Sequence, residues 1–246
     1  MLFSHKNPLK RKIGFLSDGK KIGKFFFQYL RHRGMYASFV FFLNACREWL
    51  WFASHRKTAA NLISVNLIEK NLESRKYATY YIPTPIIPFF KMIKSLTLPP
   101  SSVFVDYGAG KGRAMILAAE SGAFSKIKGL EFSPSLFKIA QKNIQSYENK
   151  TGQGYFELIH ADVLTYKVQK EDNFFYFFHP FNDDMLCSCL DNIYLSLKEY
   201  PRKVLLVYQI NSRENTSHIT KNGVFKLGKT FFSYGARFYV YEHSPN

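Results

Sequence analysis

The sequence contains few cysteines, and they do not form the pairs typical of a disulfide framework or a zinc site. Its 246 residues include only Cys46, Cys187 and Cys189, an odd number without a C-x-x-C pair. Disulfide-stabilised domains and structural zinc sites need paired or clustered cysteines. The composition therefore argues against both classes, predicts no metal site and favours a reducing, cytoplasmic environment.

The chain also lacks an apolar segment suited to export or to crossing a membrane. Its first four residues are followed by scattered lysines, without the uninterrupted apolar core of a signal peptide. The most apolar run, residues 35–53, contains Asn44, Arg47 and Glu48, which are costly inside a bilayer. We therefore expect this run to form a soluble or interfacial helix.

Acidic residues are scarce relative to basic ones. The sequence has 18 Asp and Glu against 34 Lys and Arg, which gives a formal net charge of +16. Such an excess favours anionic partners, namely nucleic acid, an anionic membrane surface or an acidic protein, and charge alone does not choose among them.

We define residues 1–34 as the basic arm, because nine Lys and Arg lie there against the single acid Asp18. Aromatic residues, including Phe25, Phe26 and Phe27, lie between these cations. The arm is either a solvated extension or an anchor to nucleic-acid phosphate or lipid head groups. Aromatic clusters further along favour lipid or protein contact, which implies a cytoplasmic protein with peripheral membrane attachment as one alternative.

The composition predicts two parts, a helical N-terminal extension at residues 1–76 and a catalytic-type domain at 77–246. The extension is predicted to serve at an interface or in substrate recognition. We name residues 81–85, Tyr-Ile-Pro-Thr-Pro, the Pro-flanked segment, because its two prolines forbid a regular helix. Helical spacing resumes at residues 86–96.

Strand-like and helix-like segments alternate after residue 102, which is typical of a parallel sheet with crossover helices. The predicted strands are 103–106, 126–131, 154–160, 173–179 and 203–209, and the predicted helices begin near 114 or span 136–147 and 183–199. The last segments, 223–232 and 236–242, predict an antiparallel hairpin. The sequence therefore predicts an α/β fold with helices between its strands.

The most informative motif follows the first predicted strand and reads Asp106-Tyr107-Gly108-Ala109-Gly110-Lys111-Gly112-Arg113. Glycine lacks a Cβ and tolerates positive φ, so this turn lets the backbone approach a ligand closely. The amides of the following helix point into the same crevice, which predicts a nucleotide-like cofactor. A dinucleotide fold needs a small residue at the position of Arg113, and a P-loop needs Gly-Lys-Ser/Thr after a four-residue gap. The sequence has neither, so it argues against both kinds of phosphate-binding site.

The spacing D-x-G-x-G-x-G, with an acid at the end of the next strand, resembles the class I S-adenosylmethionine-dependent methyltransferases. The resemblance covers residues 80–242 and implies a Rossmann-like fold. It implies a seven-stranded, mostly parallel sheet with a C-terminal antiparallel hairpin, and S-adenosyl-L-methionine as cofactor. The Pro-flanked segment before D-x-G-x-G-K-G-R is similar to a bacterial subset, distantly like the seven-stranded protein lysine methyltransferases.

The resemblance implies which residues bind the cofactor. Asp106 is expected to accept hydrogen bonds from the glycine turn and the cofactor's ammonium group, Glu131 to accept from the ribose hydroxyls, and Asp162 to contact adenine. A turn-capping or solvated carboxylate is the alternative for each acid. The full expected set is Tyr81, Thr84, Asp106, Tyr107, Gly108, Ala109, Gly110, Gly112, Glu131, Asp162 and Val163. The side chains of Lys111 and Arg113 are expected to point away, toward solvent or an acidic partner.

The expected catalytic residues are His179, Pro180 and Phe181, which lie where the family carries its motif after the fourth strand. Related members often have Asn-Pro-Phe, so His179 adds a titratable imidazole. It either positions or deprotonates the nucleophile, or it is a strand-end histidine with a structural role. Methyl transfer needs little beyond in-line placement and desolvation, so its backbone carbonyl is an alternative to its ring.

We expect the chain to transfer a methyl group to an N or O nucleophile of a protein or small molecule. One alternative is a nucleic-acid methyltransferase, favoured by the net charge of +16 and the likeness of His-Pro-Phe to base-gripping loops. The other is a non-catalytic module that senses a cofactor or docks on a membrane, favoured by the basic arm and by the absence of the usual Asn.

Overall fold

The structure is a computed structural model, and it describes three single residues and six longer segments. These are Leu43, Cys46, Leu50 and residues 84–152, 155–178, 183–210, 216–221, 223–233 and 236–245. The basic arm and the predicted boundary after residue 76 lie outside the described residues. The sheet belongs to the second of two units into which the chain divides, Glu48–Asn246. In the segments described, no helix combines the length and apolar character needed to span a bilayer.

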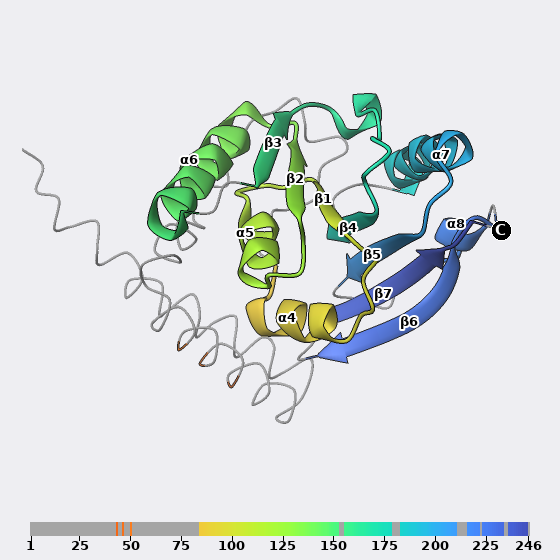
Figure 1. Ribbon diagram of the computed structural model, residues 1–246, viewed down its shortest axis with the longest axis horizontal. Helices are drawn as coiled ribbons and strands as arrows, with labels where there is room; N and C mark the ends of the chain where they lie inside the picture. Colours follow the sequence, from red (N-terminus) through yellow and green to blue (C-terminus); the bar gives the residue numbers. More distant parts are fainter. Residues whose placement is uncertain are drawn as a thin grey trace, which may run out of the picture. The chain divides into compact units, whose positions relative to one another are not determined.

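Seven strands form one sheet in the order β3-β2-β1-β4-β5-β7-β6 (Figure 1). They are β1 (Val103–Tyr107), β2 (Lys126–Glu131), β3 (Phe156–His160), β4 (Phe174–Phe178), β5 (Val204–Ile210), β6 (Lys226–Ser233) and β7 (Ala236–His243). The first five strands run parallel, and β7 pairs antiparallel with β5 and β6. This confirms the predicted α/β, mostly parallel sheet with a C-terminal hairpin.

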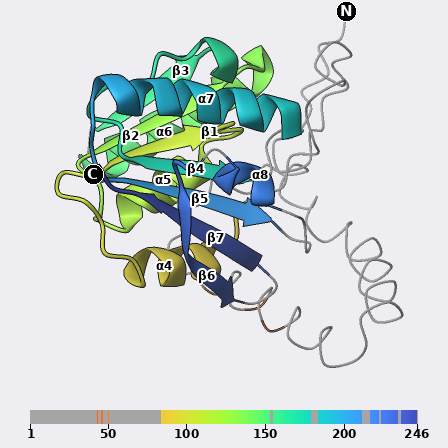
Figure 2. The ribbon, with the colours of Figure 1, turned by 90° about the vertical axis from the view of Figure 1, so that its right-hand side faces the viewer.

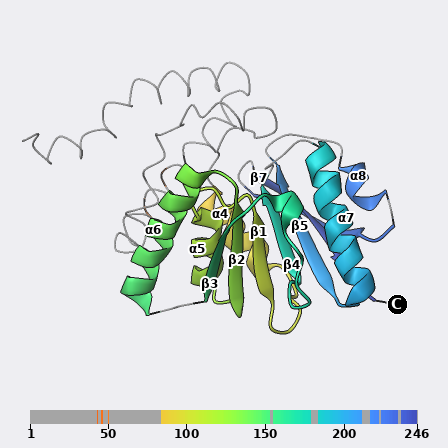
Figure 3. The same ribbon diagram turned by 90° about the horizontal axis from the view of Figure 1, so that it is seen from above.

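Helices cover both faces of the sheet (Figure 3). On one face lie α4 (Ile86–Lys94), α5 (Arg113–Glu120) and α6 (Pro134–Thr151); on the other lie α7 (Asp183–Glu199), the short α8 (Ser217–Thr220) and a 3₁₀ turn, η3 (Val163–Thr165). Strand β4, Phe-Phe-Tyr-Phe-Phe, is buried between these layers along nearly its whole length. Aromatic and β-branched strands suit a sheet that is covered twice, because both of their faces lose contact with water.

The element boundaries follow local capping. Helix α6 begins two residues before the predicted start, because Ser133 caps it by accepting from the Leu136 amide and Pro134 occupies its first turn. It ends at Thr151 and is capped by Gly152, whose φ of 69° suits a residue without a side chain. The short α8 and η3 were not predicted, since they are too brief to show helical periodicity.

The order of strands places a topological switch point between β1 and β4. Strand β1 lies between β2 and β4, so the chain winds outward from β1 on one side and continues from β4 on the other. In such sheets ligands bind outside the carboxyl ends of the strands at this switch point. The start of β7 lies at the same end, because Arg237 of β7 pairs with Ile210 at the end of β5 (Figure 2).

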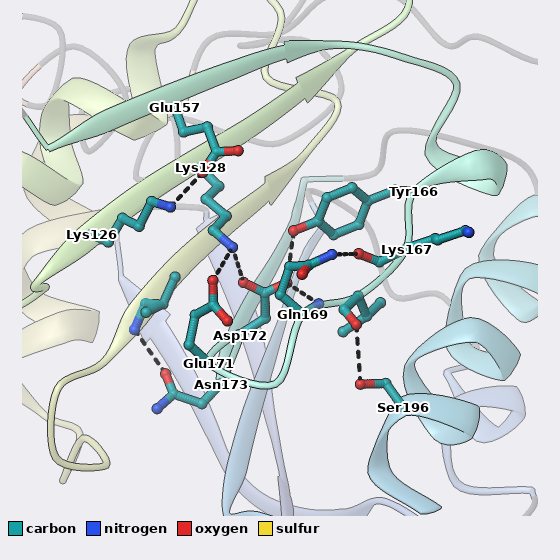
Figure 4. A network of polar contacts seen from close by, with 12 residues as sticks. Lys126, Lys128, Glu157, Tyr166, Lys167, Gln169, Glu171, Asp172, Asn173 and Ser196 are labelled. Atoms are coloured by element: carbon teal, nitrogen blue, oxygen red, sulfur yellow. Dashed lines mark hydrogen bonds and ion pairs between the residues drawn. The ribbon is translucent and has the colours of Figure 1, made fainter. Parts of the chain in front are cut away.

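Near the opposite end of the strands, the buried Lys128 and Asp172 and their partners form what we name the amino-end cluster. Its members are Lys128, Tyr166, Glu171 and Asp172, which Figure 4 shows, and Arg202. Lys128 Nζ lies 2.9 Å from Glu171 Oε1 and 2.7 Å from Asp172 Oδ1. Tyr166 Oη donates to Asp172 Oδ2 at 2.7 Å, and Arg202 Nε donates to the Asp172 carbonyl at 2.8 Å. These bonds join the loops before β4 and β5 to the middle of β2.

Candidate functional site

The glycine turn lies at the carboxyl end of β1 and leads directly into α5. Gly108, Gly110 and Gly112 have φ values of 92°, 57° and 79°, a region that side chains with a Cβ rarely adopt. The turn is held to β2 because the amides of Gly108 and Ala109 donate to the Leu130 carbonyl at 3.0 and 2.8 Å. The backbone therefore has the shape that the sequence predicted.

Close packing beneath the turn depends on Gly129 of β2. A Cβ at Gly129 would lie 2.3 Å from Met115 Sδ and 2.9 Å from Ala109 Cβ. Both distances are far below van der Waals contact, so only glycine lets α5 and the turn settle on β2. The contact explains the role of Ala109, whose buried methyl group packs on the strand.

Glu131, at the end of β2, bonds to the glycine turn. The Gly110 amide donates to Glu131 Oε2 at 2.7 Å, and the Ser133 amide donates to Oε1 at 2.8 Å. Burial raises the pKa of Glu131, and these backbone hydrogen bonds oppose the shift. Each carboxylate oxygen keeps further acceptor capacity, which ribose hydroxyls can use.

Asp106 is buried at the end of β1, one residue before the turn. Its side chain is 3% exposed, and burial, together with the charge of Glu131, raises its pKa to about 8. From the sequence, Asp106 was expected to accept hydrogen bonds from the glycine-turn amides. In the structure, the Leu130 carbonyl accepts from the amides of Gly108 and Ala109, and the Glu131 carboxylate accepts from the amide of Gly110. A buried carboxyl with a raised pKa is typical of a functional site. A cationic ligand bound beside Asp106 would favour the ionised form of its carboxyl group.

Residues after β2 and β3 form the side of the crevice where adenine was expected. Asp162 caps η3, with Oδ1 accepting from the Leu164 amide at 2.9 Å, which matches the capping alternative for this residue. Val163 is buried. Phe132, next to Glu131, is 58% exposed, and its carbonyl lies 3.0 Å from His160 Nε2. Phe132 was not predicted as a site residue, although an aromatic residue directly after the acid at a strand end could have indicated it.

The structure corrects two expectations about side chains near the turn. Lys111 and Arg113 were expected to point toward solvent, but they are only 4% and 5% exposed. Burial lowers the pKa of Lys111, and its carbonyl accepts from Asn143 Nδ2 at 2.9 Å. Tyr107 also differs from a simple binding residue, because its ring stacks on Phe177 inside the core. Only the Tyr107 backbone can therefore face a ligand at the turn.

Thr84 of the Pro-flanked segment reaches the same end of the sheet. It is 4% exposed, and its Oγ1 lies 3.5 Å from Tyr176 Oη of β4. Tyr81, His179, Pro180 and Phe181 lie outside the described residues. No group of three or more potential metal ligands occurs among the residues that the structure describes.

Comparison with known proteins finds a shared fold and no close relative. No protein-family model and no curated protein matches the sequence. A Methanococcus maripaludis protein, provisionally described as an S-adenosyl-L-methionine-dependent methyltransferase, matches with a TM-score of 0.52 and 15% identity, over 66% of this chain and 86% of that chain. The pyocyanin biosynthetic protein PhzM matches with a TM-score of 0.50 and 14% identity, over 64% of this chain and 55% of that chain.

A third structure is an RNA methyltransferase from Salinibacter ruber in complex with S-adenosyl-L-homocysteine. Its TM-score is 0.48 at 21% identity, over 66% of this chain and 94% of that chain. The first two similarities show that the sheet domain has a Rossmann-like fold, which it shares with these proteins.

Proposed function

We propose that the chain is an S-adenosylmethionine-dependent methyltransferase that acts on an N or O nucleophile of a protein or small molecule. The observation that carries this proposal is the positive-φ glycine turn at the carboxyl end of β1, beside the buried carboxyl groups of Asp106 and Glu131. A fold of this class hosts many chemistries, so the function is argued from this site.

The residues at the crevice fit such a cofactor. The turn presents backbone without side chains, Glu131 keeps acceptor capacity beside it, and exposed Phe132 offers an aromatic face next to Glu131. Aromatic faces suit adenine, since a flat ring stacks on them. When bound, S-adenosylmethionine supplies an activated methyl group on a sulfonium.

We assign the chain's own residues the following roles. Glu131 accepts from the ribose hydroxyls, and Asp162 and Val163 border the adenine. Asp106 accepts from the α-ammonium group of the cofactor, which favours its ionised form despite burial. The glycine turn, which lacks side chains at three positions, lets the backbone approach the ligand closely.

We place the acceptor beyond β4, where residues 179–181 follow its last residue in sequence. His179 there either deprotonates the nucleophile or positions it through its backbone carbonyl, while Pro180 and Phe181 shape the wall. Variants distinguish these roles: His179→Ala removes the imidazole and keeps the carbonyl. Full activity of His179→Ala at neutral pH would exclude the His179 imidazole as the general base.

Calorimetric titration of the purified chain with S-adenosylmethionine and S-adenosylhomocysteine tests the cofactor assignment. We expect saturable binding of both, and absence of binding to either would overturn the proposal. Transfer of a radiolabelled methyl group into fractionated lysate then identifies the acceptor. Label in protein or small molecules supports the proposed acceptor class, whereas label in RNA or DNA would favour the nucleic-acid alternative.

We also propose that the extension at residues 1–76 is a separate recognition part and that the basic arm binds an anionic surface. Its nine cations against one acid support attraction to anionic lipid, and the aromatic residues between them support interfacial contact. Deleting residues 1–34 is expected to reduce sedimentation with phosphatidylserine vesicles and to leave cofactor affinity unchanged. Equal sedimentation of the full and shortened chains would show that the arm is a solvated extension.

A further inference from the structure

A row of buried polar side chains joins the Pro-flanked segment to the carboxyl ends of β4 and β5. Thr84, Tyr176 and Gln209 come from three different elements and are 4%, 0% and 0% exposed. Phe89 of α4 lies edge-on to the Tyr176 ring, with centroids 5.6 Å apart, so the helix after Thr84 also packs on this row. Burying polar groups costs free energy unless they are paired, so packing alone does not explain their presence.

The hydrogen bonds along the row have a direction. Tyr176 Oη contacts both Thr84 Oγ1 and Gln209 Oε1. An amide oxygen can only accept, so the single hydroxyl hydrogen of Tyr176 is donated to Gln209. Thr84 then donates to Tyr176. Burial raises the pKa of Tyr176 well above its ordinary value, and the hydrogen bond with Thr84 opposes this shift.

The row lies beside the proposed cofactor carboxyl. Tyr176 is the direct neighbour of Asp106 across the β1–β4 pairing, and the charges of Asp106 and Arg113 both act on its phenol group. Gln209 pairs with Phe178, the last residue of β4. Gln209 Nε2 has no hydrogen-bond partner among the described residues. The row thus runs from the neighbourhood of Asp106 to the strand end that precedes His179.

We propose that Tyr176 and Gln209 are positioning residues that hold Thr84, just before α4, beside the amino-acid end of the methyl donor. This inference rests on the proposed function. Because the hydroxyl of Thr84 contacts Tyr176, the network acts through the placement of Thr84 and the start of α4 and not through a hydroxyl contact with the ligand. Asp106 and Thr84 then lie beside the same part of the donor.

Thr84→Val, Tyr176→Phe and Gln209→Leu each remove one link with little change in volume. The two ligands to compare by calorimetry are S-adenosylhomocysteine and 5′-methylthioadenosine, which lacks the amino-acid end. We expect each variant to bind S-adenosylhomocysteine roughly tenfold more weakly, the effect of about one hydrogen bond, and to bind 5′-methylthioadenosine like the unmodified chain. Thr84→Ser keeps a hydroxyl and is expected to restore the affinity.

Tyr166→Phe is the matched control, because it removes a buried tyrosine hydroxyl from the amino-end cluster. It is expected to lower the melting temperature and leave both affinities unchanged. Equal weakening of both ligands, or unchanged S-adenosylhomocysteine affinity in folded Thr84→Val, overturns the positioning role. If the unmodified chain binds neither ligand, the proposed function fails and this inference fails with it.

Discussion

Two groups of buried polar side chains lie near opposite ends of the same parallel strands, and they differ in how well they are paired. In the amino-end cluster, Lys128 meets Asp172 and Glu171, and Asp172 also accepts from Tyr166. At the carboxyl end, which we name the carboxyl-end cluster (Thr84, Asp106, Glu131, Tyr176 and Gln209), two acids lie close together. There the pKa of Asp106 rises to about 8, with burial as the main cause and Glu131 as the second.

The difference separates a structural role from a binding role. Opposite charges that are buried together with hydrogen bonds hold loops in place, and removal of one partner leaves an uncompensated charge. A buried acid beside another acid is unfavourable for folding, so its presence points to a cationic ligand. We therefore expect substitutions at the amino end to change stability and those at the carboxyl end to change affinity.

The largest effect is expected from Asp172→Asn in the amino-end cluster. It leaves the buried Lys128 ammonium without its closest anion and should lower the free energy of unfolding by about 3–5 kcal/mol. Urea unfolding measures this change. Glu157→Gln is the control, because the Glu157–Lys126 pair is half exposed and its loss should cost at most about 1 kcal/mol. Similar losses in the two variants would contradict the assigned role.

Gly110→Val tests the binding role at the glycine turn. Valine is strained at a φ of 57°, and it would bring a side chain to the backbone surface proposed to meet the cofactor. We expect affinity for S-adenosylhomocysteine to fall by at least roughly 100-fold, about 2.7 kcal/mol. Gly122→Val is the control, since Gly122 has a similar φ of 63° with open space around it. If both variants lost affinity equally, general strain would be the cause.

Asp106→Asn should weaken cofactor binding and, at high pH, raise the free energy of unfolding. The pKa of Asp106 is raised from 3.8 to about 8, so its protonated form contributes stability that is complete below about pH 4 and is lost as the pH rises through 8. The variant lacks this loss and should be more stable than the unmodified chain at about pH 9. It should bind S-adenosylhomocysteine roughly tenfold more weakly, because the ammonium loses its anion. A parallel pH dependence of unfolding in both chains would contradict the assignment.

The smallest effect is expected from Tyr107→Phe. The Tyr107 hydroxyl is buried and has no hydrogen-bond partner among the described residues. Its removal should leave stability unchanged or raise it by about 1 kcal/mol, whereas Tyr166→Phe should cost about 1–3 kcal/mol because it strips a bond from Asp172. Thermal unfolding of the two variants gives the comparison. A loss in Tyr107→Phe as large as in Tyr166→Phe would show that this hydroxyl has a partner.

Local patterns in the sequence predicted the elements well, and they failed for contacts between distant residues. The span predicted for α7 matches its bounds, because Asp183–Glu199 carries acids at its start and a regular apolar face. Nothing local indicated that Lys128, inside a β-strand, would meet Asp172 in a loop after the next strand. Likewise, Thr84 and Tyr176 are 92 positions apart, and only the sheet order brings them together.

The candidate site divides in the same way. The glycine turn and Glu131 were predictable because a short stretch of backbone defines their geometry. The exposure of Lys111 and Arg113 was predicted wrongly, since both residues are buried. The predicted catalytic residues after β4 stay a prediction.

The hydrogen bonds that Leu130 and Glu131 accept from the glycine turn also bear on the speed of binding. Because three successive amides of the turn are already engaged by β2, its conformation does not have to be created by the ligand. A preformed loop loses little conformational entropy on binding, so association is not slowed by rearrangement of this part of the pocket. Any slow rearrangement during cofactor binding would then have to occur outside the glycine turn.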